Sequence, residues 1–411
     1  MSDGFEVLLF FFLYQHYFGD DEEPQMSLED KRRRDRRYPR IALKSFHYSA
    51  FVQLYHSGND QSLLNCCGVD HKIFRELLAL FEPVYDRFTV DKWTGEIRLR
   101  KPQGRPRELD AIGALGLVLF WYRTRGSCAR AIAFPFGLTA TPMYQWLKFG
   151  RRVLLSVLQN VDVAKCQPPT NEEVDRYVEA ISAKYPVLAP FRVWGAVDGL
   201  KLRLQQSSNW ALQNMYYNAW TEGCYVSSVL VFAPDGRIRF CVINVPGSYH
   251  DSNIADHGLY DKMEEVFDRT GGRIVVDAAF KICAKRFLLR SAQNAPMNAT
   301  LGEHRVNQAA TSVRQLSEHG MRMLQGQFPR LKDSIRFDST DELDRRVSLH
   351  LMILLYNYQT ARVGINQILN TYMSETPGLN YYAYTSAGER SQVDETADFL
   401  FFGGTDYIGD R

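Results

Sequence analysis

Four acidic residues in the second half of the chain have the spacing of a catalytic site. Asp198 lies directly after an apolar strand in VWGAVDG, and Asp251 lies just beyond the second strand of an expected hairpin. Asp277 ends the short strand RIVVD, and Glu318 lies on a later helix in SVRQLSEHG. Because strand ends of one sheet meet at one edge, we expect the three aspartates to gather there, within reach of Glu318.

Clustered carboxylates repel one another and are costly to bury without partners. A divalent cation resolves this conflict, since Mg²⁺ takes oxygen ligands from several separate elements. Two such ions can stabilise the attacking and leaving oxygens of a phosphodiester displacement. Each acid also has a structural interpretation, because an Asp after a strand often forms a turn, Asp251 with Ser252 can cap a helix, and Glu318 can be a surface residue.

The elements that must position these acids alternate between strands and helices. The turn residues Pro234-Asp235-Gly236 predict a hairpin. The expected strands are residues 191–197, 225–232, 238–245 and 273–276, and the expected helices follow Asp251 and span about 281–289, from 311 past 322, and 341–369. Residues 292–311 look polar and irregular. The pattern predicts an α/β fold, a mixed sheet covered by helices, over residues 190–372.

The rest of the chain divides into four further parts. We expect a flexible basic arm over 1–45, a helical DNA-binding domain over 46–165, a linker helix over 166–189 and a C-terminal tail over 373–411. Thr170 and Glu173 form a capping box that opens the linker helix.

Three closely spaced helical patterns, over about 109–122, 127–134 and from Thr141 onward, resemble a helix-turn-helix. Thr141 is the expected N-cap of the third helix, with Pro142 at its first position. Candidate DNA contacts on that third helix are Lys148, Arg151 and Arg152. A plain helical bundle with a solvated basic face is the alternative.

Further basic residues could contact DNA outside this domain. Arg105 and Arg107, in Gly104-Arg105-Pro106-Arg107, resemble a minor-groove hook, although so short a motif is weakly specific. The run KRRRDRRYPR over 31–40 suits nuclear import or phosphate contacts, or forms a solvated arm. These basic segments stand out because the net charge of the 411 residues is only +2.

Cysteine and apolar patterns exclude other classes. The seven cysteines include no CxxC pair, which argues against a disulfide framework or a zinc site and favours a reducing compartment. The apolar run VLLFFFL over 7–13 is too short to span a bilayer, so a buried element is expected there and no membrane partner.

The ordered blocks from Trp194 to Leu331 resemble the catalytic domain of Harbinger-type transposases and Harbinger transposase-derived nucleases, within the DDE superfamily of endonucleases. The matching blocks are Ala196-Val197-Asp198-Gly199, Tyr217-Asn218-Ala219-Trp220, Pro246-Gly247-Ser248-Tyr249-His250-Asp251-Ser252, Val275-Val276-Asp277-Ala278-Ala279-Phe280, and Arg314, Glu318 and Phe328 at the family's intervals. The Asp277 block is a looser match, because the family has Gly and Tyr where this chain has Ala279 and Phe280. Two further departures are Ala219 in place of Gly, and Arg322-Met323-Leu324-Gln325, which lacks the family's Lys.

The resemblance implies a ribonuclease-H-like fold with a catalytic triad of Asp198, Asp251 and Glu318. It implies two Mg²⁺ or Mn²⁺ ions, with Asp277 as an auxiliary ligand or a structural cap. Arg314, one turn before Glu318, would hold that carboxylate, contact DNA, or form a simple helical pair. His250 would contact the scissile phosphate or order a metal ligand, or be a packed turn residue.

The implied function is that of a nuclear transposase or endonuclease that cuts double-stranded DNA at transposon ends and transfers strands. Members of the family often work with a separate Myb-like DNA-binding protein, so such a protein and a second copy of the chain are further partners that the resemblance suggests. The alternatives are a domesticated, catalytically silent DNA-binding or chromatin-associated protein, and a ribonuclease with the same fold.

Overall fold

The computed structural model describes residues 45–90, 97–99, 107–126, 128–281, 285–291, 300–335, 342–363 and 367–373. The described residues from Phe46 onward belong to one unit. Expectations for the apolar run 7–13, the basic run 31–40, Arg105 and the tail beyond Met373 lie outside the described residues. Within the described ranges, no helix has both the length and the apolar character needed to cross a bilayer.

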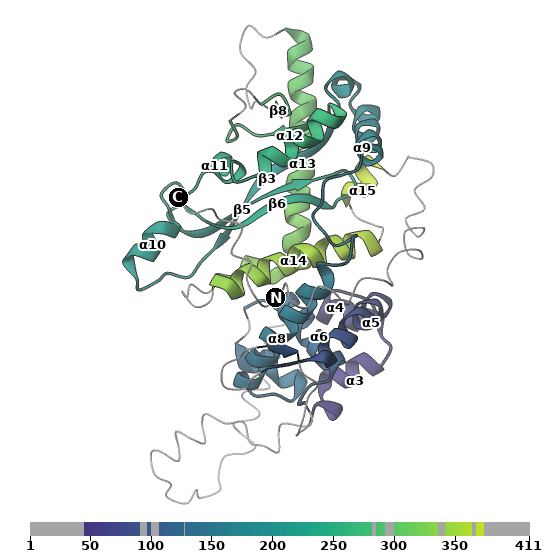
Figure 1. The fold of residues 1–411 in the computed structure, drawn as a ribbon, viewed down its shortest axis with the longest axis vertical. Helices are drawn as coiled ribbons and strands as arrows, with labels where there is room; N and C mark the ends of the chain where they lie inside the picture. The colour runs from purple at the N-terminus through teal and green to yellow at the C-terminus, as the bar shows by residue number, and fades with distance from the viewer. Residues whose placement is uncertain are drawn as a thin grey trace, which may run out of the picture. The chain divides into compact units, whose positions relative to one another are not determined.

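The N-terminal half is helical, as its apolar spacing predicts (Figure 1). Its helices are η2 (Phe46–Tyr48), α3 (Ala50–His56), α4 (Asp60–Cys67), α5 (His71–Arg87), α6 (Ala111–Arg123), α7 (Ala129–Ala133), η3 (Phe134–Phe136) and α8 (Ala140–Leu158). Two short antiparallel strands, β1 (Phe88–Val90) and β2 (Ile97–Leu99), follow α5. The predicted N-cap Thr141 is wrong, because α8 already begins at Ala140 and Thr139 is its cap. Pro142 is tolerated there, since N–H groups of a first turn have no intrahelical partner.

The linker helix α9 (Asn171–Lys184) begins as the sequence predicts. The Thr170 hydroxyl accepts a hydrogen bond from the Glu173 N–H at 3.2 Å, and Glu173 Oε2 accepts one from the Thr170 N–H at 2.9 Å. This confirms the capping box. The 3₁₀ helix η4 (Pro186–Phe191) then leads into the sheet.

The sheet contains both antiparallel and parallel pairs, which confirms the mixed α/β fold class. Its strands are β3 (Val193–Arg203), β4 (Tyr217–Asn218), β5 (Gly223–Phe232), β6 (Ile238–Pro246), β7 (Arg273–Val276) and β8 (Leu288–Arg290). Along the main path the order is β6-β5-β3-β7-β8, with the short β4 also paired to β5. The pairs β6–β5 and β5–β3 are antiparallel, whereas β3–β7 and β7–β8 are parallel.

Two sequence expectations for this sheet are wrong. The first strand does not end before Asp198 but continues to Arg203, because β3 stays paired with β5 as far as Arg203↔Tyr225. The expected helix over 281–289 is absent from its described residues, which end in β8. Leu288 pairs with Ile274, so parallel pairing with β7 takes up the apolar residues assigned to that helix.

Alternation along the strands divides the sheet into two buried faces. On one face, Ala196 and Val275 pack in the same apolar cluster as residues of α13 (Leu301–Gln327) and α14 (Glu342–Val363). On the other face, Val197 and Val276 pack with α9, α11 (Asp251–Ala255) and α12 (Leu259–Thr270). The first cluster is continuous with the core of the N-terminal helices.

The last helices differ in extent from the prediction. α13 begins at Leu301 rather than near 311, because Thr300 and Glu303 form a second capping box. It is followed by η5 (Pro329–Lys332), α14 and α15 (Gln367–Tyr372). The single helix expected over 341–369 is therefore described as α14 and α15, with residues 364–366 outside the described ranges.

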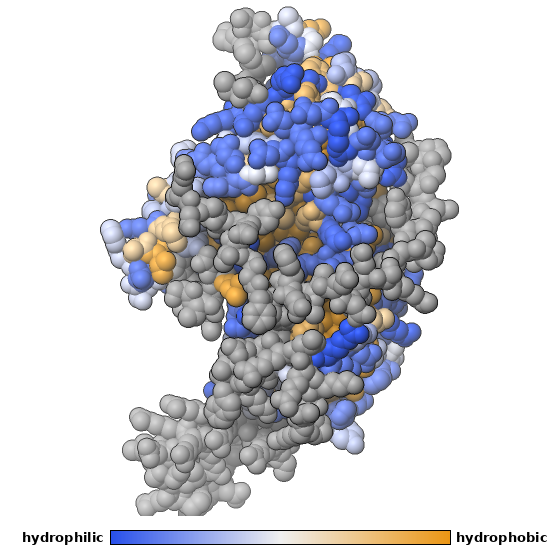
Figure 2. Space-filling view, in the orientation of Figure 1, coloured by the Kyte–Doolittle hydropathy of each residue, from blue (hydrophilic) through white to orange (hydrophobic). Residues whose placement is uncertain are grey.

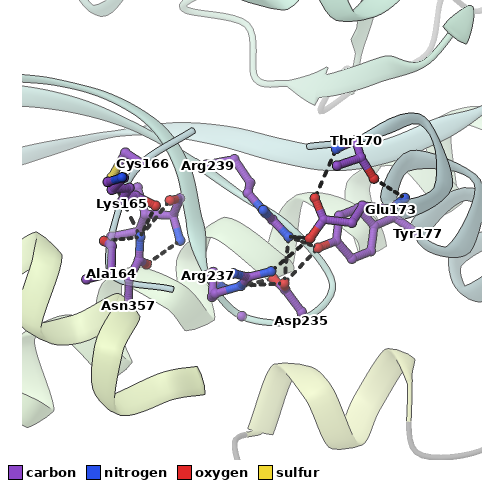
Figure 3. A network of polar contacts seen from close by, with 12 residues as sticks. Ala164, Lys165, Cys166, Thr170, Glu173, Tyr177, Asp235, Arg237, Arg239 and Asn357 are labelled. Atoms are coloured by element: carbon purple, nitrogen blue, oxygen red, sulfur yellow. Dashed lines mark hydrogen bonds and ion pairs between the residues drawn. The ribbon is translucent and has the colours of Figure 1, made fainter. Parts of the chain in front are cut away.

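A buried ionic network joins α9 to the β5–β6 hairpin (Figure 3). The antiparallel pairing of β5 with β6 confirms the hairpin turn predicted at Pro234-Asp235-Gly236. Asp235 accepts hydrogen bonds from the Tyr177 hydroxyl at 2.7 Å, Arg237 Nε at 2.8 Å and Arg239 Nη2 at 2.9 Å. Glu173 accepts from both arginines, at 3.0 and 2.8 Å. Every carboxylate in this network therefore faces a guanidinium group.

Candidate catalytic carboxylate site

Asp198 lies in the middle of the sheet, on the central strand β3. By alternation its side chain shares the face of Ala196, which packs with α13 and α14. Its Oδ1 accepts a hydrogen bond from the Gly199 N–H at 2.8 Å. Burial raises the pKa of Asp198 to about 6, against the opposing effect of that hydrogen bond. The charges of Asp277 and Asp251 raise it further, and that of Arg314 lowers it.

Asp277 lies level with Asp198 on the neighbouring parallel strand. The register pairs Ala196 with Val275, so the same register places Asp277, one residue beyond β7, beside Asp198. Val275 belongs to the same apolar cluster as Ala196, which puts both acids on the face of α13. Asp277 Oδ1 also accepts a hydrogen bond from the Ala279 N–H at 2.9 Å, which closes the turn after the strand. Asp277 thus closes a turn, and its role as an auxiliary metal ligand stays a prediction.

Asp251 approaches β3 from the other face. It is the first residue of α11, and the cap is His250, whose side chain makes no capping bond. A Cβ atom added to Gly199 would lie 2.4 Å from Asp251 Oδ2, so the missing side chain at Gly199 makes room for this carboxylate. Asp251 Oδ1 is buried without a hydrogen-bond partner.

The electrostatic setting of Asp251 includes a residue that the sequence interpretation missed. Burial raises the pKa of Asp251, Lys201 and His250 lower it, and Asp277 raises it. Lys201 lies two positions after Gly199 on β3 and therefore points to the same face. The alternation of side chains along a strand could have identified Lys201 from the sequence, if the first strand had been extended beyond Asp198.

Glu318 lies on α13, which packs against β3. It forms the predicted one-turn ion pair with Arg314, with 3.0 Å between Arg314 Nη2 and Glu318 Oε1. Arg314 also lies close enough to lower the pKa of Asp198, and its Nε is buried without a hydrogen-bond partner. The structure therefore brings Arg314 to the aspartates and holds Glu318 on Arg314.

The chemistry of these donors suits a divalent cation. Asp198 and Asp251 have raised pKa values, partly because neighbouring carboxylates repel their charge, and one buried oxygen of Asp251 has no donor. A hard cation would satisfy both deficits with oxygen ligands. Across the described residues, however, no three Asp, Glu, His or Cys side chains already form a group close enough to hold a metal ion. The acids fit a metal chemically, but a three-ligand cluster is not preassembled.

The basic residues of α8 are engaged within the chain. Lys148 Nζ lies 3.1 Å and Arg152 Nη2 3.6 Å from the carboxylate of Asp344 on α14. The Arg151 guanidinium lies 4.9 Å from the centre of the Trp121 ring. DNA contacts by Lys148 or Arg152 would therefore compete with ion pairs to Asp344.

Arg107, expected in a minor-groove hook, has a structural role. Its guanidinium lies 4.3 Å from the centre of the Tyr85 ring and donates to the Tyr85 carbonyl at 2.8 Å and to that of Phe88. Only 13% of its side chain is exposed. The physical reason is that the apolar wall of Tyr85 and Phe149 accommodates the flat cation.

Comparison with known proteins adds one finding. Searches among curated proteins and among solved structures found no match. A family model described as DDE superfamily endonuclease matches residues 197–357, a span that contains Asp198, Asp251, Asp277 and Glu318. The match likens residues 197–357 to DDE superfamily endonucleases and, with the mixed sheet, bears out the ribonuclease-H-like fold class.

Proposed function

We propose that this chain is a DNA endonuclease of the transposase type that hydrolyses phosphodiester bonds with the help of Mg²⁺ or Mn²⁺. The observation that carries the proposal is the level placement of Asp198 and Asp277 on neighbouring parallel strands, facing the helix of Glu318. This differs from the triad expected from sequence intervals, because Asp277 takes the central role given to Asp251. Asp251 becomes a fourth acid, held against Gly199.

In this mechanism Asp198 and Asp277 would hold the metal ions, with Glu318 as a further ligand from α13. Divalent ions bound there would activate water or a DNA 3′-hydroxyl and stabilise the leaving oxygen. With a pKa of about 6, Asp198 is mostly ionised at neutral pH and ready to bind a cation.

Arg314 would have two roles, one toward Glu318 and one toward DNA. Its ion pair holds the Glu318 carboxylate beside Arg314, whose charge acts on Asp198. Its Nε, buried without a partner, is a spare donor for a phosphate oxygen. If Arg314 bound a DNA phosphate instead of Glu318, the Glu318 carboxylate would become available as a metal ligand.

The narrower assignment to Harbinger-type transposases, with transposon ends as substrate, rests on the ordered sequence blocks. The departures at Ala219 and Gln325 leave the motifs around Asp198, Asp251 and Glu318 intact, whereas the motif of Asp277 matches more loosely. We further propose that the chain acts in the nucleus, supported by the basic run over 31–40. Deleting residues 31–40 should then shift a fluorescent fusion out of the nucleus, and unchanged nuclear signal would contradict that role.

The test of the proposed function is cleavage of supercoiled plasmid and of linear duplexes, with Mg²⁺, with Mn²⁺ and with EDTA. The variants are Asp198→Asn, Asp277→Asn and Glu318→Gln, which keep side-chain size while removing charge. Each should lower the metal-dependent rate at least about a hundredfold. Asp268→Asn, an exposed acid on α12, is the matched control and should cleave like the wild type.

Two outcomes would change the proposal. Wild-type rates in Asp198→Asn and Asp277→Asn would exclude these acids as metal ligands. A loss in Asp251→Asn as large as that in Asp198→Asn, with Asp277→Asn active, would restore the triad expected from sequence. If the wild type retains DNA but cleaves none with either ion, the chain is a catalytically silent DNA-binding protein.

A further inference from the structure

An exposed set of large apolar side chains lies in one short segment. Trp220 is 92% exposed and Trp210 is 78% exposed, the highest values among large hydrophobic residues in the described ranges. Met215 and Tyr217, between them, are each 42% exposed. The segment includes α10 (Trp210–Tyr216) and β4 and extends from one end of the sheet (Figure 1), where apolar atoms gather in the space-filling view (Figure 2). We call residues 210–220 together with Tyr249 the aromatic surface.

Local hydrogen bonds explain why these side chains point outward. Asn209 Oδ1 caps α10 by accepting from the N–H groups of Ala211 and Leu212, at 3.1 and 3.2 Å, which sets Trp210 at the first helical position. Asn218 Oδ1 accepts from the Thr221 N–H at 3.1 Å and closes the turn that carries Trp220. The two tryptophans are therefore held on the surface by capped backbone.

The aromatic surface is fastened to the loop that leads into Asp251. Asn218 Nδ2 donates to the Gly247 carbonyl at 2.6 Å, and Ser248 Oγ donates to the Met215 carbonyl at 2.7 Å. A Cβ at Gly247 would lie 2.5 Å from the Tyr225 carbonyl oxygen, so glycine permits this close contact. Tyr249, 43% exposed, lies in the same loop, two residues before Asp251. The aromatic surface is thus fastened to the loop that leads to Asp251, whose charge acts on Asp198.

The charge of this region suits an anionic polymer. Between Gly199 and Trp220 the chain has two cationic side chains, Lys201 and Arg203, and no acidic one, and the next acidic side chain is the exposed Glu222. Exposed aromatic rings beside cations are the combination that binds unpaired nucleic acid, because every base has a flat face that can stack on a ring.

We propose that the aromatic surface stacks on unpaired DNA bases next to the phosphate that is cut. The inference rests on the proposed function, since it takes its direction from the nearby carboxylates. Two residues of the Tyr217-Asn218-Ala219-Trp220 motif then have different roles. Asn218 binds the motif to the Gly247 loop, and Trp220 contacts the bases. The substrate class is accordingly a duplex with unpaired nucleotides at the cleavage position.

The test measures DNA binding without cleavage, in an Asp198→Asn background. One probe is a blunt duplex, and the other is the same duplex with three unpaired nucleotides, one of them the fluorescent base 2-aminopurine. The variant is Trp210→Ala/Trp220→Ala, and Trp220→Phe tests rescue by another ring. Tyr48→Ala, which removes a 70% exposed ring outside the aromatic surface, is the matched control.

The double variant should bind the probe with unpaired nucleotides, here called the frayed probe, at least about tenfold more weakly, and it should lose the quenching of 2-aminopurine fluorescence. Its affinity for the blunt duplex should stay within twofold of the value before substitution. Trp220→Phe should retain most of the affinity, and Tyr48→Ala all of it. Unchanged binding of the frayed probe would overturn this inference alone. An equal loss on both probes, or lost self-association with unchanged DNA binding, would also overturn it, the latter pointing to a protein interface. If the background protein binds neither probe, the proposed function fails as well.

Discussion

Two regions of the molecule bury carboxylates in opposite electrostatic settings. At the β5–β6 hairpin, burial alone would raise the pKa of Asp235, but Arg237, Arg239 and the Tyr177 hydroxyl hold it well below its usual range. At the carboxylate site, burial raises the pKa of Asp198 to about 6, and Asp277 and Asp251 add repulsion. Arg314 is the cation that opposes this increase, and it is shared with Glu318.

The difference distinguishes carboxylates that stabilise the fold by pairing with arginines from carboxylates that remain available to a ligand. The hairpin network supplies guanidinium groups for both of its carboxylates, and so it can join α9 to the sheet without any ligand. At the carboxylate site, Arg314 and Lys201 only partly offset burial and mutual repulsion, since the pKa values of Asp198 and Asp251 stay raised, and this costs stability in the absence of a ligand. Electrostatic cost of this kind is concentrated at sites that bind or react.

The largest effect should follow from breaking the paired region. Arg239→Met removes the more buried of the two arginines that contact both Asp235 and Glu173 and leaves Arg237 as their remaining cation. We therefore expect a loss of about 3 kcal/mol in the free energy of unfolding, the lower end of the cost of breaking a buried ion pair. Urea denaturation followed by circular dichroism measures it. Arg305→Met removes an exposed arginine of α13 and should change stability by less than about 0.5 kcal/mol. Equal, small effects for both variants would show that the network contributes little.

Removing a charge from the carboxylate site should raise the free energy of unfolding rather than lower it. Because the folded pKa of Asp198, about 6, exceeds its unfolded value of about 3.9, the native state binds this proton more tightly. Wild-type stability without metal therefore falls as pH rises from about 4 to 6 and stays lower above that window. Asp198→Asn should thus gain on the order of 2 kcal/mol over the wild type between pH 4 and pH 7.

Asp235→Asn provides the control of opposite direction. The lowered pKa of Asp235 contributes stability that is present above pH 4 and is lost as pH falls. Relative to the wild type, this variant should lose stability as pH rises from about 2 to 4 and should stay less stable above that window. If both aspartate variants show the same pH trend, the contrast between the two regions is wrong.

A solvent-exposed pair should give the smallest effect. Lys148 and Asp344 join α8 to α14 at 3.1 Å, but 43% of the Lys148 side chain is exposed. A double-mutant cycle with Lys148→Ala and Asp344→Ala should give a coupling of about 0.2–1 kcal/mol that falls at high salt. A coupling energy above that range, or one that does not change with salt, would show that this pair behaves like the buried hairpin network and not like a surface ion pair.

Much of the sheet could be predicted because its signals are local. Apolar alternation marks β5 and β6, the residues Pro234-Asp235-Gly236 mark their turn, and Thr170 with Glu173 marks the start of α9. The expected helix at 281–289 failed because its apolar residues also fit a short parallel strand, and only pairing with β7 decides between them.

The site was predicted as a set of residues but not as a geometry. Motif intervals identified all four acids, yet which of them face each other depends on register. That Asp277 is level with Asp198 follows from the pairing of Ala196 with Val275, and that Asp251 lies over Gly199 follows from a contact between distant elements. The engagement of Lys148 by Asp344 is likewise a long-range contact that no local pattern contains.

Mn²⁺ binding measured by electron paramagnetic resonance tests the central claim most directly, because it needs neither DNA nor cleavage. The free-ion signal should fall when wild-type protein is added, and Asp198→Asn/Asp277→Asn should abolish that fall, whereas Asp268→Asn should preserve it. Wild-type Mn²⁺ binding in the double variant would contradict the assignment of these two level aspartates as the metal-binding pair.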